Sequence, residues 1–329
     1  MQIGILDYEF AVPTSVTGPA DIFTTLARNY SVATGKPLNM EFNIDLISEN
    51  KGVFVRKAFG GKKPTVVGEE DQYDLVIIPA MFPNKIEMVV RKETAMIDWL
   101  RHQHNKNTEL ASICVGSFLL AATGLLNGRP ATTNWMFADM FRKLYPEVLL
   151  KDDKIIVDNG DLYTCGGAFS FTTFMIYLID KFCCREVAIA ASKILMINMY
   201  QQPQTSCCIF HFQKVDSDDA VAMIQQYLEK NYDKPITMEE LAEMSNMSPR
   251  NLFRRFEKVT SNTPLEYLQR YRIECAKKML EFPTDSIERV ALKCGYEDMK
   301  FFRKIFKRHV GMTPKEYKHG YSGRLPYRG

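Results

Sequence analysis

The run from Ser112 to Ser117 places a cysteine, Cys114, between an apolar strand-like segment and a helix-like one. A strand that turns sharply into a helix is typical of a nucleophile elbow, in which the helix amino terminus and backbone N–H groups surround the side chain. Such a position is expected to lower the pKa of the thiol and to favour thiolate chemistry. The simpler interpretation is a small buried thiol at a strand end.

A second pattern that could do chemistry occurs twice, at an offset of 50 residues. The first copy runs from Ser248 to Phe256 and then Thr263 to Tyr267; the second runs from Asp298 to Phe306 and then Thr313 to Tyr317. Each copy predicts helix, tight turn, helix, with one basic face. Tandem helix-turn-helix units of this kind fit the major groove of duplex DNA.

The predicted recognition helices separate apolar from basic side chains. The apolar positions, expected to pack inward, are Leu252, Phe256, Val259, Phe302, Ile305 and Phe306. The opposite positions, expected to read bases, are Arg250, Asn251, Arg254, Lys300, Phe301 and Lys304. Arg and Lys donate to guanine, Asn pairs with adenine, and Phe packs on a thymine methyl. Phosphate contacts are expected from Arg255, Lys258, Lys307 and Arg308. The alternative is an all-helical interaction module with a solvated basic face.

Local signals predict where these helices begin and end. Thr237 to Glu240 and Asp285 to Glu288 both have the spacing of a capping box. Ser248 followed by Pro249 predicts a helix start, and Gly295 predicts a turn. The helix from 265 to 280, which joins the two copies, is expected to present one face formed by Leu265, Leu268, Arg272, Cys275, Ala276 and Met279.

The first 200 residues alternate strand-like and helix-like segments, which predicts an α/β domain with a mostly parallel sheet. The expected strands are Gln2 to Tyr8, Phe42 to Ser48, Asp74 to Pro79, Glu109 to Cys114 and Leu162 to Cys165. The expected helices are Ala20 to Tyr30, Thr94 to His104, Phe169 to Lys181 and Glu186 to Tyr200. The polar, proline-containing run from Gln201 to Ser206 predicts the domain exit.

Composition narrows the functional class. A length of 329 residues, 46% of them hydrophobic, suits two or three globular domains. From residue 220 onward, 21 lysines and arginines face 14 aspartates and glutamates, whereas the earlier residues have 21 against 25. The basic excess therefore accompanies the repeat and favours a polyanion partner. No apolar run spans a membrane and the start lacks a signal peptide, so we expect a cytoplasmic protein with no membrane partner.

The cysteines and histidines give no sign of a metal site. Eight cysteines occur without paired C-x-x-C spacing, and five histidines are scattered. We therefore expect neither a metal, a disulfide framework nor a cofactor.

Residues 220 to 320 resemble the AraC-type DNA-binding domain. The second copy carries its hallmark, Ala291-x-x-Cys-Gly-Tyr-x-Asp-x-x-x-Phe-x-Lys-x-Phe306-Lys, followed by Gly311-x-Thr-Pro-x-x-Tyr317. The resemblance implies two rigidly spaced helix-turn-helix units that enter successive major grooves about one helical turn apart. One departure is Lys300, where the family usually has a small polar residue.

Residues 1 to 205 resemble the glutamine amidotransferase-like sensor domain of the GlxA-like subgroup of AraC-type regulators. The string from Leu119 to Trp135 carries the resemblance. It implies a flavodoxin-like fold, shared with PfpI-type proteases and isonitrile hydratases. Three positions depart from the enzymes: Ser15 replaces an acidic residue, Asn134 replaces a common His, and Val115 replaces a Thr. Since Asn cannot act as a general base near pH 7, we expect no enzyme activity and a vestigial nucleophile at Cys114.

These expectations combine into one hypothesis. Residues 1–205 form the sensor domain, 206–218 a linker, 219–320 the DNA-binding domain and 321–329 a tail. Ligands of open α/β sheets bind at the carboxyl ends of the strands. The expected pocket there comprises Ser15, Thr17, Cys114, Val115, Asn134, Trp135, Gly166 and Gly167. Trp135 could instead belong to a core or an interface.

The expected protein is a sequence-specific transcriptional regulator, an activator by resemblance. Its expected partners are double-stranded DNA, a small nitrogen-containing effector, a second copy of itself and RNA polymerase. Two alternatives remain open for the first domain: a Cys114-dependent hydrolase or hydratase activity, and a purely dimerising role.

Overall fold

A computed structural model describes residues 1–48, 65–66, 72–199, 204–207, 218–260 and 262–322. The chain forms two compact units, Met1–Gln204 and Thr205–Gly329. Most of the expected linker (208–217) and of the expected tail (323–329) lies outside the described residues.

The first unit is built around a sheet in the order β3-β2-β1-β4-β5-β9-β8. All of its described pairings are parallel except that of β8 with β9. The central strands are apolar and fully buried because helices cover both sides. Their bounds are β1 Gln2–Leu6, β2 Asn43–Ser48, β3 Thr65–Val66, β4 Leu75–Ile78, β5 Glu109–Ile113, β8 Ile156–Asp158 and β9 Leu162–Cys165. The predicted α/β class with a mostly parallel sheet is confirmed.

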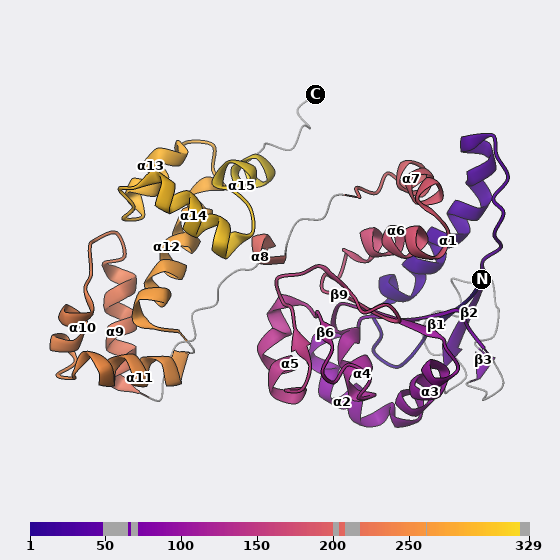
Figure 1. Cartoon of the computed structure of the whole chain (residues 1–329), viewed down its shortest axis with the longest axis horizontal. Helices are drawn as coiled ribbons and strands as arrows, with labels where there is room; N and C mark the ends of the chain where they lie inside the picture. Colours follow the sequence, from indigo (N-terminus) through magenta and orange to yellow (C-terminus); the bar gives the residue numbers. More distant parts are fainter. Residues whose placement is uncertain (49–64, 67–71, 200–203, 208–217, 261, 323–329) are drawn as a thin grey trace. The chain divides into compact units, whose positions relative to one another are not determined.

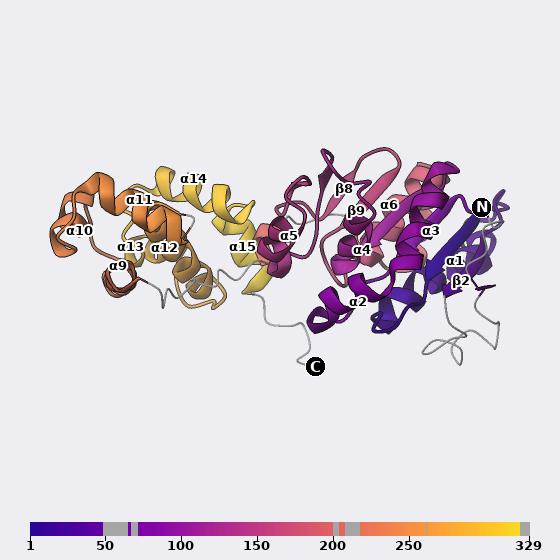
Figure 2. The ribbon, with the colours of Figure 1, turned by 90° about the horizontal axis from the view of Figure 1, so that it is seen from below.

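Helices cover this sheet in two layers. Figure 1 shows α1, α6 and α7 on one face of the sheet and α2, α3 and α4 on the other, and Figure 2 views the unit from the side of α2, α3 and α4. The helices of the unit are α1 Pro13–Thr34, α2 Ile86–Lys92, α3 Thr94–Asn105, α4 Ser117–Ala122, α5 Ala138–Leu144, α6 Phe171–Phe182 and α7 Arg185–Ile194. A two-stranded sheet, β6 Pro130–Ala131 and β7 Leu149–Leu150, lies in the connection between α4 and β8.

Two predicted helix boundaries were wrong. Helix α1 starts at Pro13 rather than Ala20, because a proline at the first helical position lacks only an N–H that would have no partner there. Helix α7 ends at Ile194, well before the predicted Tyr200, which lies outside the described residues. Met196 has φ +54°, a left-handed conformation that a right-handed helix cannot continue through.

The second unit is helical and contains two hydrophobic clusters. Its helices are α9 Asp219–Lys230, α10 Met238–Met244, α11 Pro249–Thr260, α12 Pro264–Leu280, α13 Ile287–Lys293, α14 Met299–Val310 and α15 Pro314–Tyr321. The first cluster joins α9, α10 and α11 to the amino-terminal part of α12 through Tyr267 and Leu268. The second joins α13, α14 and α15 to its remaining turns through Ile273, Ala276 and Leu280. Helix α12 therefore belongs to both clusters.

This double packing corrects the predicted buried face of α12. Leu265 is 40% exposed, whereas Tyr267, which was not predicted, is buried. The Tyr267 hydroxyl donates to Glu229 on α9 at 2.7 Å, so its aromatic ring is buried while its polar end is satisfied. A helix that packs on two clusters does not keep a single apolar stripe.

The repeated Thr-Pro-x-Glu-Tyr sequence forms a capping box in each copy. The Thr263 hydroxyl accepts from the Glu266 N–H at 3.2 Å, and the Glu266 carboxylate accepts from the Thr263 N–H at 3.0 Å. Thr313 and Glu316 repeat this arrangement at the start of α15. Each copy of the repeated sequence therefore stabilises the amino terminus of a helix, α12 in the first copy and α15 in the second.

The other predicted helix starts have mixed outcomes. Thr237 caps α10 by accepting from the Glu240 N–H, and Ser248 accepts from Asn251 N–H at the start of α11. In the second copy, however, Ser286 rather than Asp285 caps α13. Asp285 is instead 2.7 Å from the Lys293 ammonium group, an ion pair that competes for its carboxylate.

Candidate functional site

Cys114 lies on the sharp turn that the sequence predicts. Strand β5 ends at Ile113, and a short 3-10 turn, Cys114–Gly116, leads into α4. Cys114 has φ +55°, an uncommon conformation for a residue with a side chain. A Cβ on Gly116 would lie 2.4 Å from the Pro79 carbonyl oxygen, so the turn can approach β4 only with glycine there.

The electrostatic environment of Cys114 is the opposite of the one predicted. Its residue surface is only 6% exposed, and burial raises the pKa of its thiol to about 11. Hydrogen bonds from the Val115 backbone and the Asn134 side chain act in the lowering direction but are weaker. The expected lowering of the thiol pKa was therefore wrong, because loss of water disfavours the thiolate more than nearby donors stabilise it.

The predicted pocket residues are brought together only in part. Asn134 hydrogen-bonds the Cys114 thiol. The Ser117 hydroxyl lies 2.8 Å from the Thr133 hydroxyl and 3.0 Å from the Cys114 carbonyl oxygen. The Ser15 hydroxyl is used structurally: it donates to Val12 at 2.7 Å and accepts from Ala80 N–H at 3.0 Å.

The other predicted pocket residues lie around a second polar cluster or on α1. Thr17 donates to the Pro13 carbonyl one turn earlier in α1. Trp135 and Gly166 both adjoin the side chain of Gln204, which the sequence did not single out. Gly167 follows at the end of β9, beside Ser170.

Asp7 is a candidate that sequence reasoning missed. It directly follows β1, is 4% exposed, and its Oδ2 has no hydrogen-bond partner among the described residues. Burial raises the pKa of its carboxyl group. An acidic residue at the end of a buried strand is a visible signal, and it could have been included among the pocket candidates.

The predicted base-reading side chains all lie on exposed faces of α11 and α14. Arg250, Asn251, Arg254, Lys300, Phe301 and Lys304 are exposed, and Phe301 leaves 45% of its surface open. On the opposite faces, Leu252, Phe256, Phe302 and Phe306 are fully buried. Each recognition-helix candidate therefore presents its polar face to solvent while its apolar face anchors it.

The phosphate candidates are exposed as well, but one of them has a partner. Lys258, Lys307 and Arg308 are exposed on α11 and α14. Arg255 Nε lies 2.5 Å from Oδ2 of Asp218, the residue that caps α9. This guanidinium keeps the pKa of Asp218 below its usual value. A phosphate contact by Arg255 would have to share or replace this ion pair.

Gly295 makes the turn between α13 and α14. It has φ +75°, and a Cβ there would lie 2.7 Å from the Asp233 carbonyl oxygen. The predicted glycine turn is thus confirmed by both its conformation and its crowding. The turn sets the position of α14 relative to α13.

Comparison with known protein families assigns the first unit. The model of the DJ-1/PfpI family matches residues 5–181, which is more than half of the chain. The chain belongs to the DJ-1/PfpI family. A helix-turn-helix domain model matches residues 241–320, so the DJ-1/PfpI domain is followed by an AraC-type DNA-binding domain. This combination is that of the GlxA-like subgroup of AraC-type regulators.

The chain is also similar to individual proteins that are named HTH-type transcriptional regulators. The chain is 26% identical over 224 residues to the HTH-type transcriptional regulator CdhR of Pseudomonas aeruginosa, covering 68% of this chain and 66% of CdhR. It is 24% identical over 218 residues to the regulator GlxA of Rhizobium meliloti, covering 65% of this chain and 66% of GlxA. The matches thus span slightly less than two thirds of these relatives. Drosophila melanogaster DJ-1beta matches at 19% identity with a TM-score of 0.48, covering 60% of this chain and 98% of that one.

Among the described residues, no helix combines the length and apolar character needed to cross a membrane. The same part of the chain contains no group of three His, Cys, Asp or Glu side chains arranged to hold a metal ion.

Proposed function

We propose that this protein is a sequence-specific transcriptional regulator that binds double-stranded DNA through α11 and α14. The observation that carries the proposal is the pair of helices with exposed basic faces and buried aromatic anchors, held on one shared helix, α12. A helix-turn-helix domain inserts its second helix into the major groove, where its outward side chains meet base edges.

The two units are proposed to read different bases. The apolar anchors and capping boxes repeat between the copies, but the outward positions do not: Arg250 and Asn251 correspond to Lys300 and Phe301. Donor groups of Arg and Lys suit guanine, whereas the exposed Phe301 ring suits a thymine methyl. One protomer is therefore expected to recognise an asymmetric site, and a dimer two such sites. Arg255, Lys258, Lys307 and Arg308 are proposed to contact phosphates, which fix register.

The DNA proposal is tested by comparing two lysine substitutions in the full chain. Lys304→Ala removes an outward side chain of α14, and Lys278→Ala removes an exposed lysine of α12 with the same change in charge. Selection from random duplexes first gives the preferred site. At fixed salt, Lys304→Ala should then weaken binding to that site by about 1 to 3 kcal/mol while Lys278→Ala has little effect. Equal losses on specific and random duplexes would contradict base reading by Lys304.

For the DJ-1/PfpI domain we propose ligand sensing without catalysis, within residues 1–205. A protonated, buried Cys114 paired with Asn134 is poorly suited to nucleophilic attack near neutral pH. The proposed ligand is a small nitrogen-containing metabolite, and ligand binding would favour one arrangement of the DNA-binding domains in a homodimer. Activation through contact with RNA polymerase is the proposed outcome. A ligand can change this equilibrium only by its difference in affinity for the two states.

Sensing is tested by thermal-shift measurements with amino acids, quaternary amines and related nitrogen metabolites. A ligand that raises the melting temperature of the first unit and changes DNA binding supports the proposal. A domain that only dimerises should respond to none of them.

A second candidate function is a Cys114-dependent hydrolase or hydratase activity. The positive φ of Cys114 favours it, because strained backbone often occurs at reactive side chains. A turnover of an amide or isonitrile that disappears in Cys114→Ala would establish this activity and rule out the sensor-only proposal.

A further inference from the structure

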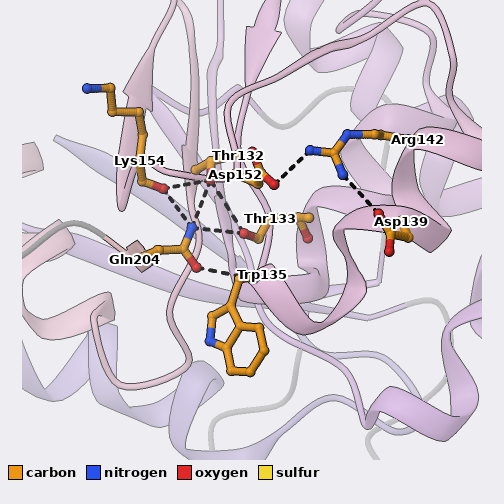
Figure 3. Close-up of polar contacts among 8 residues, drawn as sticks. All are labelled: Thr132, Thr133, Trp135, Asp139, Arg142, Asp152, Lys154 and Gln204. Atoms are coloured by element: carbon orange, nitrogen blue, oxygen red, sulfur yellow. Dashed lines mark hydrogen bonds and ion pairs between the residues drawn. The ribbon is translucent and has the colours of Figure 1, made fainter. Parts of the chain in front are cut away.

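The side chain of Gln204 lies in a polar slot of the first unit, and Figure 3 shows the groups around it. Gln204 is 4% exposed. Its Nε2 donates to Thr132 Oγ1 at 3.0 Å, to the Thr133 carbonyl at 3.0 Å and to the Lys154 carbonyl at 2.6 Å. Its Oε1 accepts from the Trp135 backbone N–H at 3.3 Å. Both ends of the carboxamide are therefore recognised.

The slot is held in shape by interactions that do not involve Gln204. Thr132 and Thr133 are fully buried. The Thr132 N–H donates to Thr164 Oγ1 at 2.8 Å, which fixes the slot to the end of β9. On its other side, Arg142 pairs with Asp152 at 2.7 Å, bracing the loop that supplies the Lys154 carbonyl (Figure 3). Since these contacts lie outside the occupant, the slot should keep its form when the occupant leaves.

Gly166 makes room for the amide. A Cβ at this position would lie 1.9 Å from Nε2 of Gln204. The space is thus open only because this residue, in the loop directly after β9, has no side chain. A glycine beside converging polar groups often marks a place where a ligand can approach the backbone closely.

The polarity of the slot selects one chemical group. Three acceptor oxygens lie around Nε2 of the Gln204 carboxamide, and the Trp135 N–H donor faces its Oε1. A carboxylate would place a negative oxygen against three acceptors, and an ammonium group would leave the Trp135 N–H without a partner. An N,N-dialkyl amide has no N–H to donate. A primary carboxamide offers two N–H donors to these three acceptors and an oxygen to the Trp135 N–H, so it matches the slot at both ends.

Gln204 belongs to the carboxyl-terminal end of the first unit and not to one of the strands or helices of its core. It is the last residue of the first unit and the first of a four-residue helix, α8 Gln204–Cys207. Among the described residues, its backbone N–H also donates to the Asp153 carbonyl at 3.1 Å. An occupant attached at such a position can leave without unpacking the sheet or its helices.

We propose that this slot is a binding site for primary carboxamides, with Gln204 as its tethered occupant, and that a free carboxamide metabolite takes its place. The inference rests on the proposed sensing function and names the ligand class. Displacement of Gln204 would free the exit of the sensor domain, where the chain continues toward the DNA-binding domain. A tethered group competes as if present at high local concentration, so free ligand must overcome it.

The proposal is tested by chemical rescue in the full chain. Gln204→Ala removes the CH2–CONH2 end of the side chain, and propionamide, which carries that end on one additional methyl group, supplies it as a free molecule. Both tryptophans, Trp99 and Trp135, belong to the first unit, so fluorescence-detected melting follows that unit alone. Propionamide should raise the melting temperature of Gln204→Ala and bind it at least about tenfold more tightly than the wild-type chain. Propionate and N,N-dimethylpropionamide should have no such effect.

Matched variants show whether the response to propionamide comes from filling the slot or from a general effect of propionamide on the protein. Gln226→Ala removes an exposed glutamine of α9 and should respond to propionamide like the wild-type chain. Gln204→Met fills the slot without hydrogen bonds and should not be rescued. Gln204→Asn, one methylene shorter, replaces the Ala variant if the latter does not fold. Equal responses of Gln204→Ala and Gln226→Ala, or rescue by propionate, would overturn the proposal.

DNA binding measured on the same samples distinguishes this outcome from failure of the proposed function. Rescue by propionamide with no effect on operator binding would leave the carboxamide site standing and refute its role in sensing. Absence of rescue in a chain whose DNA binding responds to another metabolite would refute the carboxamide site alone.

Discussion

Replacing Gly295 by alanine should destabilise the second unit through two separable effects. The left-handed backbone at φ +75° costs a residue with a Cβ about 1 to 2 kcal/mol. The new Cβ would also lie 2.7 Å from the Asp233 carbonyl oxygen, closer than such atoms approach, and moving that backbone should cost about 1 to 3 kcal/mol more. The expected total is about 3 kcal/mol, or a decrease in melting temperature of roughly 10 to 20 °C for a unit of this size.

Gly124→Ala provides the control for the first effect. Gly124 has φ +79°, but nothing lies within 4 Å of the position its Cβ would take. This substitution should therefore cost only the backbone contribution, about 1 to 2 kcal/mol, in the first unit. Tryptophan fluorescence follows the first unit, and calorimetry of the full chain follows both. Gly295→Asn, which tolerates a left-handed backbone better, should lie between glycine and alanine. Equal losses in Gly295→Ala and Gly124→Ala would refute the close contact with Asp233.

Three further predictions concern protonation and capping. Burial, with repulsion from Arg270 and Arg308, lowers the pKa of His309 from 6.5 to about 4. Because the pKa of His309 is lower in the folded than in the unfolded state, the free energy of unfolding should be highest above about pH 6.5 and should fall by at most about 3 kcal/mol toward pH 4. His309→Gln should reduce this dependence of the unfolding free energy on pH, as measured by urea titrations at several pH values. Thr313→Ala, which removes the capping hydroxyl of α15, should cost about 1 kcal/mol, and an unchanged urea midpoint would contradict the capping role. With a thiol pKa of about 11, Cys114 should be alkylated by iodoacetamide at pH 7.5 far more slowly than exposed Cys184, as read by peptide mass spectrometry; faster labelling of Cys114 would contradict its burial.

The parts of the fold that sequence predicts well are those in which local pattern and final packing agree. Strands β1, β4 and β5 are covered on both faces, so their sequences are continuous apolar runs. The two-residue strand β3 and the antiparallel edge strand β8 were not predicted, because so few residues leave little periodicity to detect. Helix starts depend on residues about three positions apart, so those at Thr237 and Ser248 were predicted correctly, whereas Ser286 replaces the predicted Asp285 as the cap of α13.

The candidate site was harder to predict from the sequence, because its properties depend on residues that are far apart in the chain. Sequence located the turn at Cys114, but the pKa of its thiol depends on how completely the surrounding fold excludes water. The carboxamide slot joins residues 132–135, 154 and 166 to Gln204, and no local pattern connects them. Gln204 itself lies in a run rich in glutamine and proline that predicts only a domain exit.

Because α12 packs into both hydrophobic clusters of the second unit, it would hold the proposed recognition helices α11 and α14 at a fixed spacing along DNA. One base pair inserted between the two DNA segments that we propose α11 and α14 contact would move the second segment by roughly 3.4 Å and rotate it by about a tenth of a turn. The helix cannot lengthen or twist to follow. Binding should therefore fall after a single insertion, and inserting a full turn of about ten base pairs should not restore it, since the angle recovers but the distance does not.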